Sequence, residues 1–173
     1  MGQAAPKTAD PAGMLTSAGQ FLTFVLGEEQ YGIEILKVQE IKGYSAITPI
    51  PNTPAYIKGV INLRGTVVPV VDLRAKFSLA ATEYNKFTVI IVVTVGEKVI
   101  GMLVDAVSDV MDIAASEMRT APDLGVRVDT RFISGMATVG ERMTVLLDID
   151  RLLSADEAAA RASRELEVEE KRI

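Results

Sequence analysis

Two stretches of this chain repeat the same spacing of glycine and apolar residues. The segment GEEQYGIEILKVQEI covers residues 27–41, and GEKVIGMLVDAVSDV covers residues 96–110. In each segment two glycines lie five residues apart, and the apolar positions that follow align without a gap. A repeated unit keeps the spacing of its turns and core positions while its surface diverges. The pattern therefore indicates an internal duplication.

A second pair of stretches extends this duplication. IKGVINLRGTVVPVVDL covers residues 57–73, and ISGMATVGERMTVLLDI covers residues 133–149. Each contains a glycine thirteen residues before an aspartate; these are Gly59 with Asp72, and Gly135 with Asp148. Because the two pairs of stretches occur in the same order, the sequence predicts two similar lobes.

The amino-acid composition excludes several classes of function. With 49% apolar residues and a mean hydropathy of +0.26, the 173-residue chain has ample material for a core. It has no cysteine and no histidine, which excludes disulfides, thiolate chemistry and the commonest general base and metal ligand. A net charge of -5, with few aromatic residues, disfavours nucleic acid binding. No apolar run is long enough to cross a bilayer and no signal peptide is visible, so we expect a cytoplasmic protein.

Local patterns predict a chain made mostly of strands. A hairpin is expected over residues 20–35, with its turn at the first repeated glycine. Arg64 and Gly65 are typical of a second hairpin turn, and Pro69 places its strand at a sheet edge or a bulge. Residues 86–95, KFTVIIVVTV, are β-branched almost throughout and predict a strand buried on both faces.

The ends of the chain differ from the folded region, which we expect to span residues 19–153. Residues 1–18 are small and polar, contain proline and lack periodicity, and so predict a disordered tail. Residues 154–173 predict a charged C-terminal helix, which Ser154 and Glu157 open as a capping box.

The repeated aspartates, Asp72 and Asp148, are the first candidates for a catalytic pair. One aspartate in each lobe is the arrangement of the aspartic proteases, but Asp72 and Asp148 lack the hydroxyl residue and glycine that should follow. The alternative is that each ends a strand and caps the turn or helix after it. The sequence also lacks a phosphate-binding loop and a calcium loop. Catalysis is therefore not expected.

Glu40 and Arg64 each lie at the end of an apolar strand. Both could be ordinary solvated turn residues, or they could form a surface ion pair at the rim of a groove between strands. The apolar floor of that groove would come from repeat-related positions, which could equally be plain core. These positions are Val38, Ile41, Val107 and Val110.

These residues carry a family resemblance. The segments QFLTFVLGEEQYGIEILKVQEIKGY, NTPAYIKGVINLRGTVVPVVDLRAKF and VIGMLVDAVSDV resemble the CheW family of bacterial chemotaxis coupling proteins. The similarity covers about residues 20–153, and NLRG followed by PVVDLR is its most specific part.

The resemblance implies an all-β fold. It consists of two interleaved, pseudo-symmetric, five-stranded β-barrel lobes of the SH3-like kind, which share an apolar interface, followed by a C-terminal helix. It further implies that the protein is not an enzyme and needs no cofactor.

The implied function is to couple methyl-accepting chemoreceptors to the histidine kinase CheA. The implied partners are the cytoplasmic tip of the receptors, the CheW-like regulatory domain of the kinase, and a second copy of this chain in rings. The protein would be recruited to receptor arrays at the inner face of the membrane without inserting into it, and would not bind nucleic acid. The alternative is a coupling protein for another receptor–kinase pathway, in pilus motility or development.

The resemblance also assigns roles to single residues. It implies a receptor-binding role for Val38, Glu40, Ile41, Arg64, Val89 and Val110. It implies a kinase-binding role for Arg119 and Leu124, the latter at a position where family members often have an aromatic residue. Gly59, Gly65 and Gly135 are expected to form structural turns.

Overall fold

The computed structural model describes residues 19–80, 83–119, 130–139 and 142–153. The predicted N-terminal tail, the charged C-terminal helix with its capping box, and Leu124 lie outside the described residues. Within the described residues, no helix is long and apolar enough to cross a membrane.

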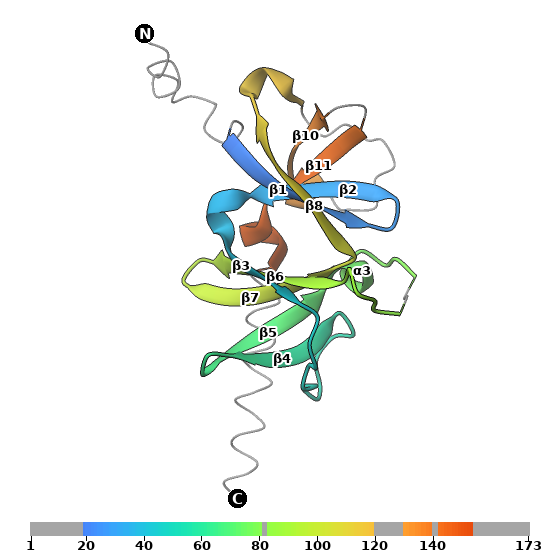
Figure 1. The fold of residues 1–173 in the computed structure, drawn as a ribbon, viewed down its shortest axis with the longest axis vertical. Helices are drawn as coiled ribbons and strands as arrows, with labels where there is room; N and C mark the ends of the chain where they lie inside the picture. Colours follow the sequence, from blue (N-terminus) through green and yellow to red (C-terminus); the bar gives the residue numbers. More distant parts are fainter. Residues whose placement is uncertain (1–18, 81–82, 120–129, 140–141, 154–173) are drawn as a thin grey trace, which may run out of the picture.

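Eleven strands and a few short helical turns make up the described chain (Figure 1). The strands are β1 (Gly19–Leu26), β2 (Glu29–Glu34), β3 (Val38–Gly43), β4 (Ile57–Leu63), β5 (Thr66–Asp72), β6 (Val89–Val95), β7 (Lys98–Val104), β8 (Ala106–Ile113), β9 (Met118–Arg119), β10 (Ile133–Val139) and β11 (Arg142–Leu147). The helical elements are η1 (Ile35–Lys37), α3 (Leu73–Lys76), η2 (Ala115–Glu117) and η3 (Thr130–Phe132), and residues 149–153 are also helical.

The two sheets have the same strand order once the repeats are superposed. One sheet runs β8-β1-β2-β11-β10-β9, and the other runs β3-β6-β7-β5-β4. Where the first sheet has the two-residue strand β9, the second has a single bridge between Thr48 and Val60. The predicted two-lobed β fold is confirmed, with a sixth, very short strand in one lobe.

The repeats exchange strands. The β1-β2 hairpin of the first repeat pairs in parallel with β11 of the second, and the β6-β7 hairpin of the second repeat pairs in parallel with β5 of the first. Each third strand, β3 or β8, then joins the sheet that contains the other repeat's hairpin. Neither lobe is therefore built from a single continuous segment (Figure 1).

The largest apolar cluster lies between the two sheets. It takes Phe24 and Tyr31 from the upper sheet in Figure 1, and Ile91 and Met102 from the lower one. Each sheet has a second, smaller cluster that does not include the other sheet. Burial of apolar area from both sheets in one core is a large stabilising contribution, and it fixes how the two lobes sit against each other.

Strand β6 contributes to two of these clusters. Ile90 and Val92 belong to the smaller cluster of the five-stranded sheet, whereas Ile91 and Val93 belong to the cluster between the lobes. All four are fully buried. Successive side chains of a strand point to opposite faces, so the predicted burial on both faces is confirmed.

The prediction that Gly59 and Gly135 form turns is wrong. Gly59 lies within β4 and Gly135 within β10, each at a shift in strand register. A Cβ atom on Gly59 would lie 2.0 Å from the carbonyl oxygen of Thr48, and one on Gly135 would lie 2.8 Å from Cε of Met118. Both glycines therefore let the short edge segment cross the bulged strand closely. Gly65, with φ of 89°, does lie in the predicted turn.

The prediction for Pro69 also needs correction. Strand β5 lies between β4 and β7, so it is not an edge strand, and the register shift in its pairing with β4 falls elsewhere. Its pairing with β7 begins at Val70, so at Pro69 the strand pairs only with β4. A residue without an N–H group is tolerated where the strand has one neighbour.

The capping role of the repeated aspartates is confirmed. The Asp72 carboxylate accepts hydrogen bonds from the backbone N–H groups of Arg74 and Ala75 at the start of α3. The Asp148 carboxylate accepts one from the N–H of Arg151. Asp72 is thus the last residue of β5 and Asp148 directly follows β11, and each begins the short helix after it.

Candidate functional site

An exposed apolar margin runs along the core between the lobes, on the edge strands β3 and β8. Ile41 of β3 lies opposite Ile91, and Val110 of β8 lies opposite Leu22. Directly opposite residues of an antiparallel pair project to the same face. Ile41 and Val110 therefore project toward the same side as the buried core between the lobes, yet each is 45% exposed.

Three half-buried valines complete this surface. Val38 lies opposite Val93 and Val107 lies opposite Phe24, while Val89 closes the β3-β6 ladder opposite Gly43. All three pack against the core between the lobes. We call the surface formed by Val38, Ile41, Val89, Val107 and Val110 the inter-lobe face. Both earlier interpretations of these residues hold in part, because the valines at 38 and 107 flank the core while Ile41 and Val110 are open to solvent.

Glu40 and Arg64 form the predicted surface ion pair. Nη2 of Arg64 lies 2.9 Å from Oε1 of Glu40, and Nη1 lies 3.3 Å from Oε2, in a forked arrangement. Arg64 occupies the β4-β5 turn with φ of 50°, next to Gly65. Since Glu40 lies opposite Val92, it projects to the other side of β3 from its neighbour Ile41.

Of the two residues with an implied kinase-binding role, the structure describes Arg119, which is not on this face. Arg119 is exposed on β9, at the opposite end of the strand order from β8, and pairs with Met136. Leu124 lies outside the described residues. The structure therefore brings together the implied receptor-facing residues and leaves Arg119 apart from them.

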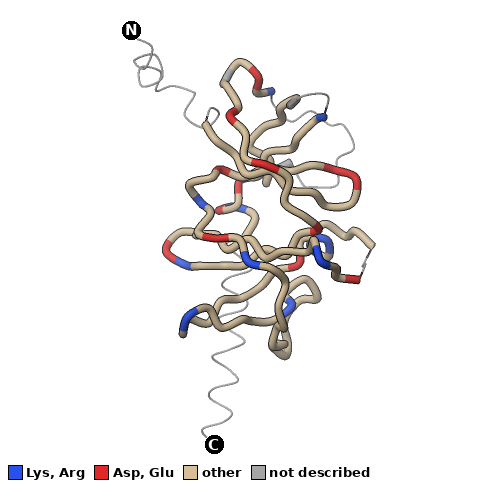
Figure 2. The backbone as a smooth tube through the Cα atoms, viewed as in Figure 1, with Lys and Arg blue, Asp and Glu red and all other residues tan. Residues whose placement is uncertain are grey.

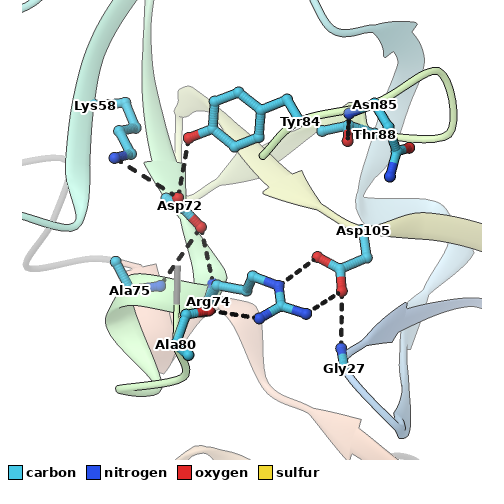
Figure 3. A network of polar contacts seen from close by, with 10 residues as sticks. All are labelled: Gly27, Lys58, Asp72, Arg74, Ala75, Ala80, Tyr84, Asn85, Thr88 and Asp105. Carbon is cyan, nitrogen blue, oxygen red and sulfur yellow. Dashed lines mark hydrogen bonds and ion pairs between the residues drawn. The ribbon is translucent and has the colours of Figure 1, made fainter. Parts of the chain in front are cut away.

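A polar network that the sequence did not predict lies at the crossover from β7 to β8 (Figure 3). Nε of Arg74 is 2.8 Å from Oδ1 of Asp105, and Nη2 is 2.9 Å from Oδ2. The backbone N–H of Gly27 donates to the same carboxylate, and Arg74 also donates to the carbonyl of Ala80. The hydrogen bond to Asp105 raises the pKa of Arg74. This network joins α3, the β1-β2 turn and the start of β8.

Asp72 extends the network. The hydroxyl of Tyr84 donates to Oδ2 of Asp72 over 3.1 Å, and Nζ of Lys58 lies 3.8 Å from the same oxygen. Partial burial, and next the carboxylate of Asp72, raise the pKa of Tyr84. A pocket of about 220 Å³ borders Asp72, Arg74, Tyr84 and Asp105. Because Asp72, Arg74 and Asp105 already bond to one another's elements or to neighbouring groups, these residues hold the surrounding segments together.

The second repeat has a related ion pair with reversed charges. Asp150 lies two residues after the capping Asp148, as Arg74 lies two residues after Asp72. Its carboxylate is 2.8 Å from Nζ of Lys37, in the crossover from β2 to β3. The charged residue two positions after the capping aspartate of each repeat was a sequence sign of these ion pairs. The residue that pairs with it could not be identified from spacing.

The arrangement offers a binding surface with an apolar centre and a charged rim. Within the described residues, no group of three acidic side chains could hold a metal ion. Glu40 and Arg64 form one ion pair, Arg74 and Asp105 form another, and Asp72 caps α3, which suits the positioning of strands more than proton transfer.

Comparison with known proteins agrees with the fold. The model of the CheW-like domain family matches residues 20–157. The chemotaxis protein CheW of Klebsiella aerogenes is 50% identical over 144 residues, which cover 83% of this chain and 87% of the relative. That of Rhizobium meliloti is 37% identical over 147 residues, covering 84% and 95%.

A solved structure gives the same result. The crystal structure of the scaffolding protein TtCheW from Thermoanaerobacter tengcongensis superposes with a TM-score of 0.71 at 34% identity, covering 76% of this chain and 85% of that one. These matches extend over nearly the whole described region. The relatives named above are chemotaxis proteins and a scaffolding protein, and none is named as an enzyme. The chain therefore belongs to the CheW-like family.

Proposed function

We propose that this protein is an adaptor that couples methyl-accepting chemoreceptors to the histidine kinase CheA in chemotaxis arrays. The observation that carries the proposal is the inter-lobe face, where Ile41 and Val110 of the two repeats are exposed side chains on the margin of a buried core. An apolar strip with a polar rim is suited to bind one face of an amphipathic helix. The cytoplasmic tip of the receptors is a helical hairpin.

In this proposal the residues of the face have two roles, apolar contact and orientation of the partner. Ile41, Val110 and the half-buried Val38 and Val89 contact apolar side chains of the receptor helix. The Glu40–Arg64 pair lies at the rim, where charged groups contribute more to orientation and association rate than to affinity. Exposed charge at the rim also disfavours partners whose charges are arranged differently.

Contact with the kinase is proposed at the outer parts of the lobes, through barrel-to-barrel association with its CheW-like regulatory domain. Arg119 and Leu124 are the proposed contacts there. The repeats also expose one apolar residue each at the second position of equivalent strands: Val67 in β5 is 47% exposed and Met143 in β11 is 48% exposed. End-to-end contacts of this kind close into rings when their rotation permits, with further copies of this chain as ring members.

Chemotaxis is favoured over pilus motility or development as the pathway. The 50% identity to a chemotaxis protein extends along most of both chains, including the segments that form the inter-lobe face. In the proposed setting the protein acts in the cytoplasm, held at receptor arrays on the inner face of the membrane. It transmits a signal by a shift in geometry at the face, without covalent change.

A binding experiment tests this proposal. The full chain is titrated separately into a receptor cytoplasmic fragment and into the kinase regulatory domain, by calorimetry. We expect measurable binding to both, and we expect Ile41→Asp to weaken receptor binding while sparing the kinase. Absence of receptor binding by the wild-type chain, at concentrations where it binds the kinase, would refute the coupling role.

A further inference from the structure

The inter-lobe face has two halves, which occupy equivalent positions in the repeats. One half lies on β8, which pairs with β1, and the other lies on β3, which pairs with β6. Thr23 of β1 and Val92 of β6 are equivalent, because each lies opposite the second glycine of its repeated segment, Gly32 or Gly101. The contacts that hold the two halves can therefore be compared position by position.

A buried threonine holds the middle of β8. Next to Thr23 the register between β1 and β8 shifts, and Ser108 is the extra residue of the bulge. The hydroxyl of Thr23 donates to the carbonyl of Asp109 and accepts from the N–H of the same residue, over 3.1 Å in each case. Because Thr23 is fully buried, these bonds lie largely out of water, where hydrogen bonds are stronger. The threonine therefore fixes β8 at its bulge, one residue before Val110.

A second contact holds the start of β8. Asp105 lies between β7 and β8, and its carboxylate accepts two hydrogen bonds from Arg74 and one from the N–H of Gly27 (Figure 3). The N–H of Asp105 donates to the carbonyl of Val25. The crossover is thereby tied to α3 of one lobe and to the β1-β2 hairpin of the other, two residues before Val107.

The middle of β3 is held by exposed contacts of longer side chains. Val92 has no hydroxyl, and the bulged residue Gln39 instead donates from Nε2 to Oγ1 of Thr94 in an exposed bond. The forked pair of Glu40 with Arg64 is also open to solvent. Such contacts contribute little, because the charges are screened by water and long side chains lose freedom in making them. Within the described residues, the middle of β3 therefore lacks the buried polar support found in β8.

The start of β3 is held less firmly than the start of β8. It follows η1, in which none of the three residues is fully buried, and Leu36 is 93% exposed. The pair of Lys37 with Asp150 ties this crossover down, and both side chains are more exposed than those of Arg74 and Asp105. Figure 2 shows acidic and basic residues beside each other between the lobes, on both sides of the molecule. The two crossovers are thus built alike but differ in strength.

We propose that Thr23, together with Arg74 acting through Asp105, positions the β8 half of the inter-lobe face, so that β8 is the fixed half and β3 is the half that adjusts to a partner. The inference rests on the proposed coupling function for the identity of that partner, the receptor hairpin. A surface that is already positioned loses little conformational freedom on binding. β8 therefore presents Val110 ready for contact, whereas Ile41 moves with β3 as the helix binds.

The first part of the test needs no partner. Hydrogen exchange of the free full chain is measured for the amides of β8 that pair with β1 and for those of β3 that pair with β6. We expect exchange to be about tenfold or more faster in β3 than in β8. Thr23→Val and Arg74→Ala should each speed exchange in β8 more than in β3, and Thr23→Ser, which keeps the hydroxyl, should stay near the wild type. Equal exchange in both strands of the wild type would overturn the inference.

The second part measures binding of a receptor cytoplasmic fragment at a temperature where every variant is folded, as checked by thermal unfolding. We expect Thr23→Val and Arg74→Ala to weaken binding about threefold to tenfold, and Thr23→Ser to recover most of the loss. Gln39→Ala, the matched change at the bulge of β3, should stay within about twofold of the wild type. A double-mutant cycle separates positioning from stability. Thr23→Val should lose most of its effect in a Val110→Ala background and keep it in an Ile41→Ala background.

Other results show which proposal fails. If Thr23→Val weakens binding equally in both backgrounds, the threonine acts through general stability and this inference is overturned, while the coupling role stands. If Gln39→Ala weakens binding as much as Thr23→Val, β3 is not the adjustable half and the inference is again overturned. If the wild-type chain does not bind the receptor fragment at all, the coupling proposal fails, and the exchange comparison alone decides which half is fixed.

Discussion

Arg64 and Glu40 join the two ends of one sheet. Glu40 lies on β3 and Arg64 follows β4, and these strands are first and last in the order of the five-stranded sheet. The two residues are 24 positions apart in the sequence, and their forked contact links the two edge strands of the sheet and so closes the lobe. Glu40 also neighbours Ile41 in β3, so in the proposed function the same contact lies at the rim of the binding surface.

Reversal of the charge of Arg64 should affect receptor binding more than the stability of the fold. Arg64 is 70% exposed, and exposed ion pairs contribute at most about 1 kcal/mol to the free energy of unfolding. We expect Arg64→Glu to weaken receptor binding about tenfold and to leave kinase binding nearly unchanged. Calorimetric titration measures both, with Lys98→Glu as a charge-matched control on β7. Equal loss of both activities would point to misfolding.

The duplicated face predicts matched effects at repeat-related positions. Ile41 and Val110 have the same exposure and equivalent places in the two sheets. A partner helix lying between the lobes would contact both, so Ile41→Asp and Val110→Asp should each weaken receptor binding about tenfold or more. Sedimentation with receptor fragments measures this. An effect at one position alone would place the helix on a single lobe.

Gly59 should tolerate no side chain. Its φ of 144° is rare for residues with a Cβ, and that atom would meet the Thr48 carbonyl at 2.0 Å. We expect Gly59→Ala to lower the free energy of unfolding by more than about 2 kcal/mol, measured by urea denaturation. Gly43→Ala is the control, because nothing lies within 4 Å of the added atom, and it should stay within about 0.5 kcal/mol. Equal stability of the two variants would rule out the close crossing.

The two crossover ion pairs should differ in strength. Arg74 and Asp105 are 17% and 28% exposed, whereas Lys37 and Asp150 are 35% and 46% exposed. Arg74→Ala leaves a half-buried carboxylate short of partners and should lower the free energy of unfolding by about 1–3 kcal/mol. Lys37→Ala should lower it by less than about 1 kcal/mol.

A double-mutant cycle checks this assignment. If Arg74 acts through Asp105, removal of both side chains together should lower the free energy of unfolding by less than the sum of the two single losses. Strict additivity would show that the two side chains do not interact.

The anchoring of Tyr84 should be visible in its titration. Burial and the Asp72 carboxylate raise its pKa, whereas a tyrosine in the unfolded chain ionises near pH 10. The folded state thus holds this proton more tightly, so the contribution to stability is complete below about pH 10 and declines as pH rises through the folded pKa. When tyrosinate absorbance is followed against pH, the wild type should show one tyrosine that ionises later than the others, and Tyr84→Phe should not show it. If the difference between the wild-type and variant titration curves is centred near pH 10, the contact of Tyr84 with Asp72 does not raise its pKa.

Features set by neighbouring residues were predictable from the sequence. The Arg64–Gly65 turn, the capping by Asp72 and Asp148, and the doubly buried β6 each follow from a few adjacent side chains. The duplication was visible because the spacing of its glycines is preserved. Close packing explains why a glycine is kept at such a position. A Cβ on Gly32 would lie 2.9 Å from Cδ2 of Leu146, too close for a side chain.

Features that depend on distant segments were not predictable from spacing. Arg74 and Asp105 are 31 residues apart, and Lys37 and Asp150 are 113 apart. Each pair forms only because the repeats exchange strands, and the family resemblance implied interleaving without identifying these contacts. Gly59 was misread as a turn residue for a similar reason, since the segment that crosses it, at Thr48, is not its neighbour in the chain.

Kinase activity reconstituted on receptor-containing membranes is the most direct test of the coupling role. Receptor membranes and CheA are combined with the wild-type chain, with Ile41→Asp, or with no addition, and phosphorylation and co-sedimentation are read from the same samples. The account predicts that the wild-type chain sediments with the receptors and raises kinase activity, and that Ile41→Asp does neither while it still binds the kinase in solution. Kinase activity that is independent of the wild-type chain, or equal activation by Ile41→Asp, would contradict it.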